Sequence, residues 1–191
     1  MTDVAKLYLI LTIFEMLEAL ITSKTRLKLL LKFFLNPSNT SYLRGLATEF
    51  SESTNAVRVE LNRLEEANML LSTYEGNKKI FRVNTTHPLF PDIQAIVFKY
   101  VGLDKLIEKV LDNIGDLKEV YLVGALANGV YTEGIDLVIV GDVNEVYLCK
   151  AVQKVEETIK KPITYTLDSS GTFSINHLPE SALKIWESYG E

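Results

Sequence analysis

Asp136 stands in the segment whose residue types come nearest to those of a catalytic site. This segment reads GALANGVYTEGIDLVIVGD, in which a small-residue turn from Gly124 precedes an apolar run that begins at Ile135. Two carboxylates that are two residues apart on a strand face the same side, where they can hold Mg²⁺ against nucleotide phosphates. Gly134 occupies the position two residues before Asp136, so this pair is incomplete.

A second group of side chains has the types that bind DNA. Asn55, Arg58 and Asn62 form one stripe of a helix expected over residues 54–70. The apolar face of the same helix is formed by Val57, Leu61 and Leu64. Asn and Arg side chains near the start of such a helix pair with adenine and guanine edges in a major groove. An ordinary solvated helix face is the alternative interpretation of the stripe.

The composition favours two small domains. The chain has 191 residues, 47% of them apolar, which is enough to bury a sizeable core. Residues 23–85 contain ten Lys or Arg and six Asp or Glu, a net charge of +4, whereas the whole chain has −5. A basic N-terminal region in an acidic protein indicates contact with nucleic acid. Cys149 is the only cysteine, which excludes a disulfide framework within one chain and favours a cytoplasmic protein.

Helices are expected to open the basic region. The first helix begins at Ser23, which can cap it, and stops before the sequence Asn-Pro-Ser at 36–38. A second, short helix is expected over residues 41–50, with Thr40 or Ser41 as its cap. Together with the helix from residue 54, these form a helix-turn-helix unit.

A hairpin follows this unit directly. Strands are expected at 70–74 and 80–83, with a Gly-Asn turn between them. STNAVRVELNRLEEANML joined to YEGNKKIFRVN resembles the winged helix of ArsR-like bacterial regulators, and the resemblance covers residues 23–85. It implies base contacts from the helix and phosphate contacts from the hairpin, or wing. The expected DNA-binding residues are Thr54, Asn55, Arg58, Asn62, Lys78, Lys79 and Arg82. Plain surface charge is the alternative for the lysines.

Strands and helices alternate in the second half of the chain. The segment THPLFPDI marks the boundary, and connecting helices follow it. Strands are expected at 120–123 and 135–140 and in PITYTLDS, with a helix at about 144–160. This order, with Gly124 and Asp136, resembles the nucleotidyltransferases of the polymerase-beta superfamily. The resemblance implies a Gly-Ser start, two aspartates two residues apart on the next strand, and a third acid on the following strand.

Several positions that the resemblance makes functional carry other residues. Ala125 replaces the serine, Gly134 replaces the first aspartate, and the expected third acid falls near Thr164, whereas Gly124 and Asp136 match. We therefore expect a vestigial nucleotide site at Gly124, Ala125, Gly134 and Asp136, with no catalytic residue, no metal and no cofactor.

The first residues are expected to form an apolar helix. Leu7 to Ile21 is about 15 residues long, shorter than the ~20 needed to span a bilayer, and is interrupted by Glu15 and Glu18. We expect neither a membrane span nor a signal peptide. The segment serves dimerisation or is an extension, and Met16 is an alternative start.

These observations predict an α+β chain with four parts. They are an N-terminal helix (1–22), a winged helix-turn-helix domain (23–86), connecting helices (87–116) and a small α/β nucleotidyltransferase-like domain (117–191). The favoured function is a sequence-specific transcriptional regulator that binds double-stranded DNA as a homodimer. Its C-terminal domain would dimerise or sense a small-molecule or nucleotide effector. The alternatives are an active nucleotidyltransferase with an accessory winged helix, and a protein interaction module.

Overall fold

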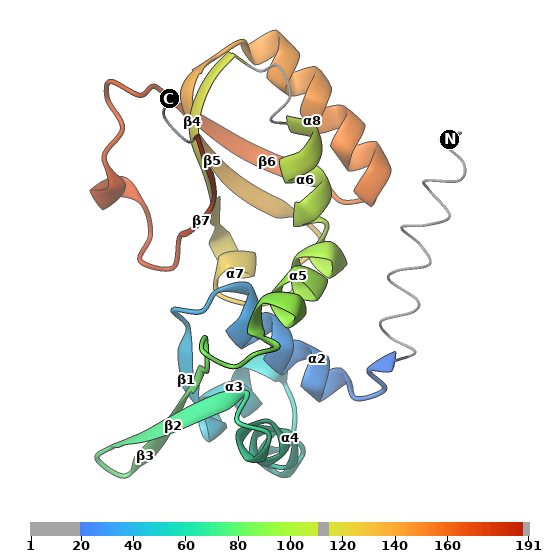
Figure 1. Cartoon of the computed structure of the whole chain (residues 1–191), viewed down its shortest axis with the longest axis vertical. Coiled ribbons are helices and arrows are strands. Elements are labelled where there is room, and N and C mark those ends of the chain that lie inside the picture. Colours follow the sequence, from blue (N-terminus) through green and yellow to red (C-terminus); the bar gives the residue numbers. More distant parts are fainter. Residues whose placement is uncertain (1–19, 111–114, 189–191) are drawn as a thin grey trace.

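The computed structural model describes residues 20–110 and 115–188, which form two sheets, one above the other in Figure 1. The expected N-terminal helix lies outside the described residues up to position 19. Within the described ranges, no helix combines the length and the hydropathy that crossing a membrane requires.

The first described helix changes its winding halfway. α2 (Lys24–Leu30) begins after Ser23, whose side chain accepts a hydrogen bond from the backbone N–H of Arg26, as expected. It continues as a π-helical segment, η1 (Leu31–Leu35), and ends before Asn36. All residues from Leu29 to Asn36 are buried, because neighbouring elements cover this segment on every side.

The second helix starts later than the sequence suggests. β1 (Thr40–Tyr42) pairs antiparallel with β3, and α3 (Leu43–Phe50) begins only after it, without a side-chain cap. The expectation that Thr40 or Ser41 caps this helix is therefore wrong. The backbone groups of both residues join the sheet instead, opposite Arg82 and Phe81.

The third helix and the hairpin complete the N-terminal part. α4 (Thr54–Glu66) is capped by Ser53, whose hydroxyl accepts a hydrogen bond from the N–H of Ala56. The helix ends before residue 70 because Asn68, at φ 56°, turns the chain into β2 (Leu70–Glu75). β3 (Lys78–Val83) follows the expected Gly-Asn turn, and the sheet order is β1-β3-β2.

Two helices lead to the second sheet. α5 (Phe90–Val101) and α6 (Leu103–Val110) are separated by Gly102, which has a left-handed backbone at φ 91°. The side-chain amide of Gln94 on α5 donates to the carbonyl oxygen of Phe34, so α5 also packs against η1. The connecting segment is therefore in contact with the first helix.

The C-terminal part is a mixed four-stranded sheet with helices on one face. Its strands are β4 (Gly115–Val123), β5 (Ile135–Val143), β6 (Ile163–Asp168) and β7 (Leu183–Glu187), in the order β6-β5-β4-β7. β5 and β6 are parallel and joined by α8 (Glu145–Ile159), whereas the other pairs are antiparallel. In Figure 1, α6 and α8 lie to the right of the sheet, and the segment with η2 (Ile175–His177) lies to the left. The short helix α7 (Gly124–Ala127) follows β4 at the junction with the N-terminal part. This mixed sheet is compatible with a nucleotidyltransferase-like domain.

Candidate functional site

The α4 residues expected to contact DNA all face solvent. Thr54, Asn55, Arg58 and Asn62 are exposed, and Val57, Leu61 and Leu64 on the other face are buried. The Ser53 cap starts the helix at Thr54, so Asn55 and Arg58 lie in its first two turns. The polar stripe therefore lies where the helical spacing predicts it.

The basic residues of the hairpin divide into two kinds. Lys79 forms an ion pair with Glu65 at 2.7 Å, so its charge is balanced within the fold. Lys78 is exposed, with its Nζ 4.8 Å from the centroid of the Tyr42 ring, and Arg82 is exposed as well. Alternate residues of a strand face opposite sides, so Lys78 and Arg82 share a face that Lys79 does not.

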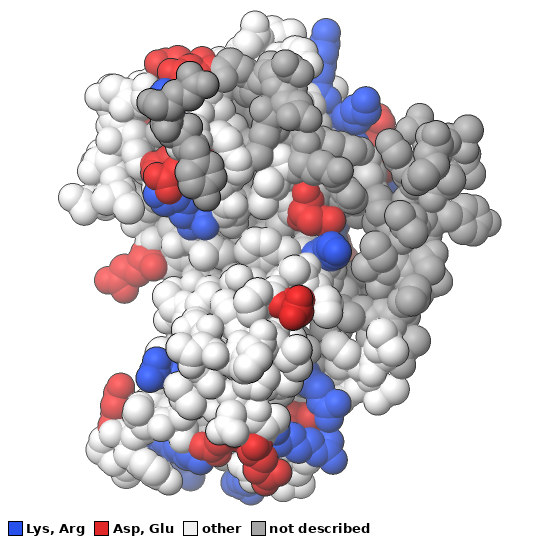
Figure 2. Space-filling model, in the orientation of Figure 1, with Lys and Arg blue, Asp and Glu red and all other residues white. Residues whose placement is uncertain are grey.

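Ion pairs leave an excess of cations in the N-terminal part. Four of its six acids are paired: Glu49 with Lys32, Glu52 with Lys28, Glu60 with Arg26 and Arg63, and Glu65 with Lys79. Five cations have no acidic partner among the described residues: Lys24, Arg44, Arg58, Lys78 and Arg82. Four of these five cations lie on α3, α4 and the hairpin, together with the two acids that are not in these ion pairs, Glu66 and Glu75. Figure 2 shows that acidic side chains also lie at this lower end, so the surface is mixed rather than uniformly basic.

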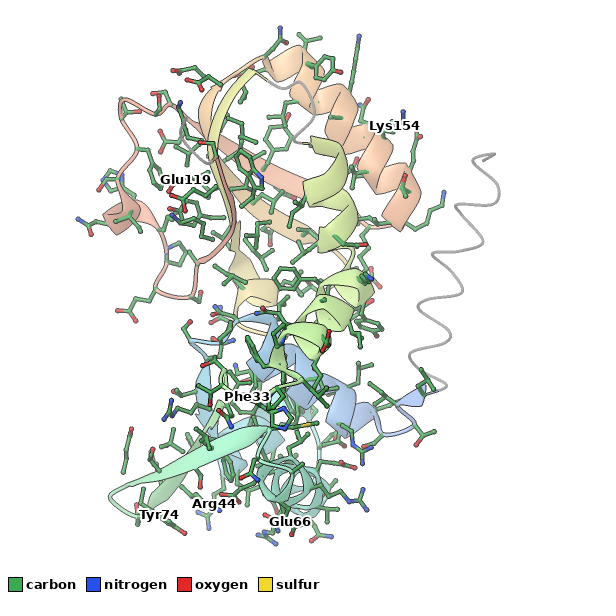
Figure 3. The ribbon with its side chains drawn as sticks, in the orientation of Figure 1. Phe33, Arg44, Glu66, Tyr74, Glu119 and Lys154 are labelled. Atoms are coloured by element: carbon green, nitrogen blue, oxygen red, sulfur yellow. The ribbon has the colours of Figure 1, made fainter. Side chains whose placement is uncertain are left out.

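Arg44 is a candidate contact that the sequence reasoning missed. It is exposed on α3, and Figure 3 shows it at the same lower end of the molecule as Tyr74 of the hairpin and Glu66 of α4. Tyr74 is 75% exposed. The signal available in the sequence was an arginine in the first turn of the helix that precedes the polar stripe.

A buried ion pair fixes α4 against α2. Glu60, only 6% exposed, accepts hydrogen bonds from Nε of Arg26 at 2.8 Å and from Arg63 at 3.2 Å. Burial alone would raise the pKa of Glu60, but hydrogen bonds from Arg26 and Ser23 and the charges of both arginines lower it below its ordinary 4.5. This contact joins α4, which carries Arg58, to α2.

Asp136 lies beside Gly124, on the face of the sheet opposite α6 and α8. It stands opposite Val123 on β4 and Thr164 on β6. A Cβ on Gly124, which has φ +72°, would lie 2.6 Å from Oδ2 of Asp136, so glycine allows the carboxylate this close. The structure thus brings Gly124 and Asp136 together and has Thr164 beside them, where the resemblance expects an acid.

The two substituted positions differ in their surroundings. Ala125 is exposed in the first turn of α7. Gly134 directly precedes β5, and a Cβ there would lie 3.5 Å from the carbonyl oxygen of Pro162, an ordinary van der Waals contact. Packing does not exclude a side chain at position 134, so the missing carboxylate is a property of the sequence alone.

These donors do not fit a pair of metal ions. Mg²⁺ is bound through oxygen ligands, usually with carboxylates among them, and Asp136 is the carboxylate that lies beside Gly124 and Thr164. Across residues 20–110 and 115–188, no group of three or more His, Cys, Asp or Glu could hold a metal ion. The side chains of Asp136 and Thr164 can accept and donate hydrogen bonds.

Two buried polar side chains, which the sequence reasoning did not single out, join the two parts of the chain. Nζ of Lys32 donates to the carbonyl oxygen of Asn128 at 2.8 Å and pairs with Glu49 of α3. Nδ2 of Asn36 donates to the carbonyl oxygen of Ala127 at 3.0 Å. The last carbonyls of a helix lack partners within it, and a lysine is favoured there. The available signal was a lysine and an asparagine, Lys32 and Asn36, in the otherwise apolar run of residues 29–36.

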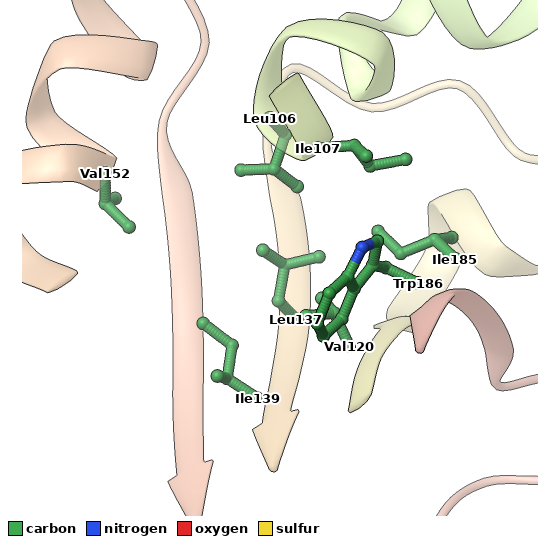
Figure 4. Close-up of a pocket in the computed structure, with 8 residues that line it drawn as sticks. All are labelled: Leu106, Ile107, Val120, Leu137, Ile139, Val152, Ile185 and Trp186. Atoms are coloured by element: carbon green, nitrogen blue, oxygen red, sulfur yellow. The ribbon is translucent and has the colours of Figure 1, made fainter. Parts of the chain in front are cut away.

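An apolar pocket lies on the other face of the C-terminal sheet (Figure 4). Its lining consists of Leu106, Ile107, Val120, Leu137, Ile139, Val152, Ile185 and Trp186. Leu137 and Ile139 alternate with Asp136 and Val138 along β5, so the pocket faces away from the Asp136 carboxylate. We assign it to the core between the sheet and its helices.

Comparison with known proteins yields partial structural matches. No protein-family model matches the chain, and no curated protein matches its sequence. A chain of the complex between a tri-AMPylated HEPN toxin of Shewanella oneidensis and MNT antitoxin is 17% identical, with a TM-score of 0.34. The match covers 46% of this chain and 71% of that one. A candidate nucleotidyltransferase from Sulfolobus solfataricus is 22% identical with a TM-score of 0.32, and its match covers 45% of this chain and 78% of that one. Each is a protein to which part of this chain is similar.

Proposed function

We propose that the chain is a transcriptional regulator that binds double-stranded DNA sequence-specifically through a winged helix-turn-helix formed by residues 23–86. The observation that carries the proposal is the stripe of Asn55, Arg58 and Asn62, exposed on the helix that buried Glu60 holds in place. In this function α4 enters the major groove, where Arg58 pairs with a guanine edge and the asparagines pair with adenine edges.

The distribution of charge supports the same function. Lys78, Arg82 and Arg44 have no acidic partner among the described residues, so they are available for contacts with phosphates. Lys79 is not available for phosphates, because the carboxylate of Glu65 already balances its charge. Phosphate contacts position a protein on the duplex without reading its sequence.

The nucleotidyltransferase-like domain, residues 117–191, has a non-catalytic role in this proposal. It dimerises the protein or senses a small-molecule or nucleotide effector at the face that carries Gly124 and Asp136. The single carboxylate supports binding rather than phosphoryl transfer. The bonds from Lys32 and Asn36 to the end of α7 supply a rigid connection to the DNA-binding part.

Selection of bound sequences from genomic fragments tests the proposal. Enrichment of one motif by the wild-type protein, lost in Arg58→Ala and kept in Lys79→Ala, is the expected result. Binding that is equally strong for all sequences, or absent at low salt, contradicts it.

The second candidate is an active nucleotidyltransferase with an accessory winged helix. The close approach of Gly124 to Asp136, with Thr164 alongside, favours it, because this geometry resembles part of a catalytic site. Transfer of radiolabel from a ribonucleoside triphosphate with Mg²⁺ or Mn²⁺, lost in Asp136→Asn, would establish this candidate. We expect no transfer.

A further inference from the structure

Lys78 of the hairpin lies between an aromatic residue and an acid on one face of the N-terminal sheet. β3 is the central strand of this sheet, and in the β2–β3 register Glu75 lies directly opposite Lys78. On the other side of β3, Tyr42 of β1 is opposite Ile80, which is two residues from Lys78 and shares its face. Each flanking strand therefore offers one side chain that attracts the ammonium group of Lys78.

The ammonium group lies at the ring. Nζ of Lys78 is 4.8 Å from the centroid of the Tyr42 ring, within the roughly 6 Å at which a cation is attracted to an aromatic face. Lys78 forms no ion pair with Glu75 or with any other acid in the part of the chain that the structure describes. A ring attracts the cation without neutralising it, so the charge of Lys78 stays available to an anion.

The position of Tyr42 is fixed by the two elements that it joins. It is the last residue of β1 and directly precedes α3, so the sheet and the helix both constrain its backbone. Its half-buried ring lies against Gly45 in the first turn of α3. A Cβ on Gly45 would stand 3.1 Å from Cε1 of the ring and 3.2 Å from its Cζ, so glycine permits this close approach. The ring is thus a fixed contact between α3 and the hairpin.

We propose that Tyr42 is a positioning residue for DNA binding, whose ring keeps the ammonium group of Lys78 away from Glu75 and available to a phosphate of the duplex. The proposal rests on the proposed function for its ligand, whereas the contact between ring and ammonium group belongs to the chain without DNA. When the ring is removed, Lys78 pairs with Glu75, and the hairpin loses this phosphate contact.

Arg82 lies on the same face as Lys78 and has no acid opposite it. Its neighbours across the sheet are Thr40 on β1 and Leu71 on β2, and neither side chain can neutralise a guanidinium group. Arg82 therefore needs no ring to stay available to a phosphate. Its contribution to DNA binding should survive the loss of Tyr42, which makes Arg82 the matched comparison for Lys78.

A double-mutant cycle on the salt dependence of DNA binding tests the positioning role. Fluorescence anisotropy of the full chain with a mixed-sequence duplex gives the slope of log affinity against log salt, and circular dichroism checks the fold of each variant. Tyr42→Leu should reduce this slope by about 0.9, the value for one lost phosphate contact, as Lys78→Ala does. The variant with both substitutions should lose no more than either one alone. Tyr42→Phe keeps the ring and should bind as the wild-type chain does.

Two further variants separate positioning from a general loss of structure. Glu75→Gln removes the competing carboxylate, so combined with Tyr42→Leu it should restore the wild-type slope, whereas alone it should leave the slope nearly unchanged. Arg82→Ala combined with Tyr42→Leu should lose the sum of the two single effects. Additive losses of Tyr42→Leu and Lys78→Ala, or no rescue by Glu75→Gln, would overturn the positioning role and leave DNA binding itself standing.

NMR of the chain without DNA provides a measurement that is independent of the proposed function. The ring current of an aromatic side chain shields protons above its face, so the ε-methylene protons of Lys78 should resonate upfield in the wild-type chain and in Tyr42→Phe, and further downfield in Tyr42→Leu. Unshielded protons in the wild-type chain would overturn the positioning role without any variant. A wild-type chain that binds no duplex at low salt would overturn the proposed function and this proposal together.

Discussion

Gly129 lies directly against the backbone of Lys32. A Cβ on Gly129 would stand 2.4 Å from Cα of Lys32 and 2.9 Å from its carbonyl oxygen. Gly129 also has a left-handed backbone, at φ +74°. This position therefore needs glycine for two reasons, its own conformation and the approach of η1 to the chain that leaves α7.

Gly129→Ala should destabilise the chain by about 3 kcal/mol or more. Left-handed strain accounts for about 1–2 kcal/mol, and overpacking against backbone adds about 1–3 kcal/mol. Gly76→Ala is the matched control, because Gly76 has φ +60° but nothing within 4 Å of its Cβ position. Urea unfolding of both variants separates strain from packing. Equal losses in the two variants would show that the contact with Lys32 contributes nothing.

Arg58→Ala should weaken binding to the cognate DNA site by about 1–3 kcal/mol and relax specificity at one base pair. The reason is that Arg58 is exposed on α4 and has no acidic partner among the described residues. Fluorescence anisotropy with specific and random duplexes measures the effect. Unchanged discrimination between the two duplexes would remove Arg58 from base recognition.

Lys78→Ala should weaken binding to all sequences alike and reduce the salt dependence of the affinity. Lys79→Ala is its neighbour-matched control and should leave the salt dependence nearly unchanged, because Lys79 is engaged with Glu65. The same anisotropy titrations at several salt concentrations give the slopes. A larger reduction of the salt dependence in Lys79→Ala than in Lys78→Ala would contradict the assignment of Lys78 as the phosphate contact of the hairpin.

Gly134→Asp should fold normally and gain affinity for Mn²⁺. A Cβ at position 134 meets only ordinary contacts, and the new carboxylate would stand two residues before Asp136. Isothermal titration calorimetry measures Mn²⁺ binding, and thermal unfolding checks the fold. Gly134→Asn is the control for size without charge and should not gain affinity. Failure of Gly134→Asp to bind more Mn²⁺ than wild type would show that the backbone here no longer suits a metal site.

Glu60→Gln should cost about 1–3 kcal/mol near neutral pH, because it removes the charge-assisted hydrogen bonds that Arg26 and Arg63 donate to the carboxylate. The pKa of Glu60 in the folded chain is lowered from 4.5, so the stability it confers is present above that value and is lost as the pH falls through the lowered pKa. The difference between variant and wild type should therefore shrink in acid. Unfolding curves from pH 7 to pH 3 measure it, with exposed Glu66→Gln as control. A difference that stays constant over this range would contradict the ion pair.

Periodicity predicted most of the fold, because the pattern of α4 and the Gly-Asn turn are decided by neighbours in the sequence. β1 was not predicted, since the pairing of Thr40 with Arg82 joins residues far apart in the chain and overrides a local cap. The contact between η1 and the end of α7 was also not predicted, because it too joins residues far apart in the chain. Lys32 and Asn36 are buried only because α7 brings carbonyl oxygens to them, and no local pattern encodes that contact. Of the candidate site, the exposure of Arg58 follows from helical spacing, and a shared site for Gly124 and Asp136 is what the resemblance implies. The pairing of Lys79 with Glu65 follows from neither.

The complete burial of the segment from Leu29 to Asn36 bears on how the protein melts. α4 packs against this helix, and so do α5 and the residues that follow α7. Both halves of the molecule therefore bury part of it. Heating that loosens either half exposes the shared helix and removes support from the other. Calorimetry should accordingly record one cooperative transition for two sheets, and a fragment cut at residue 86 would leave Phe34 and Lys32 facing water.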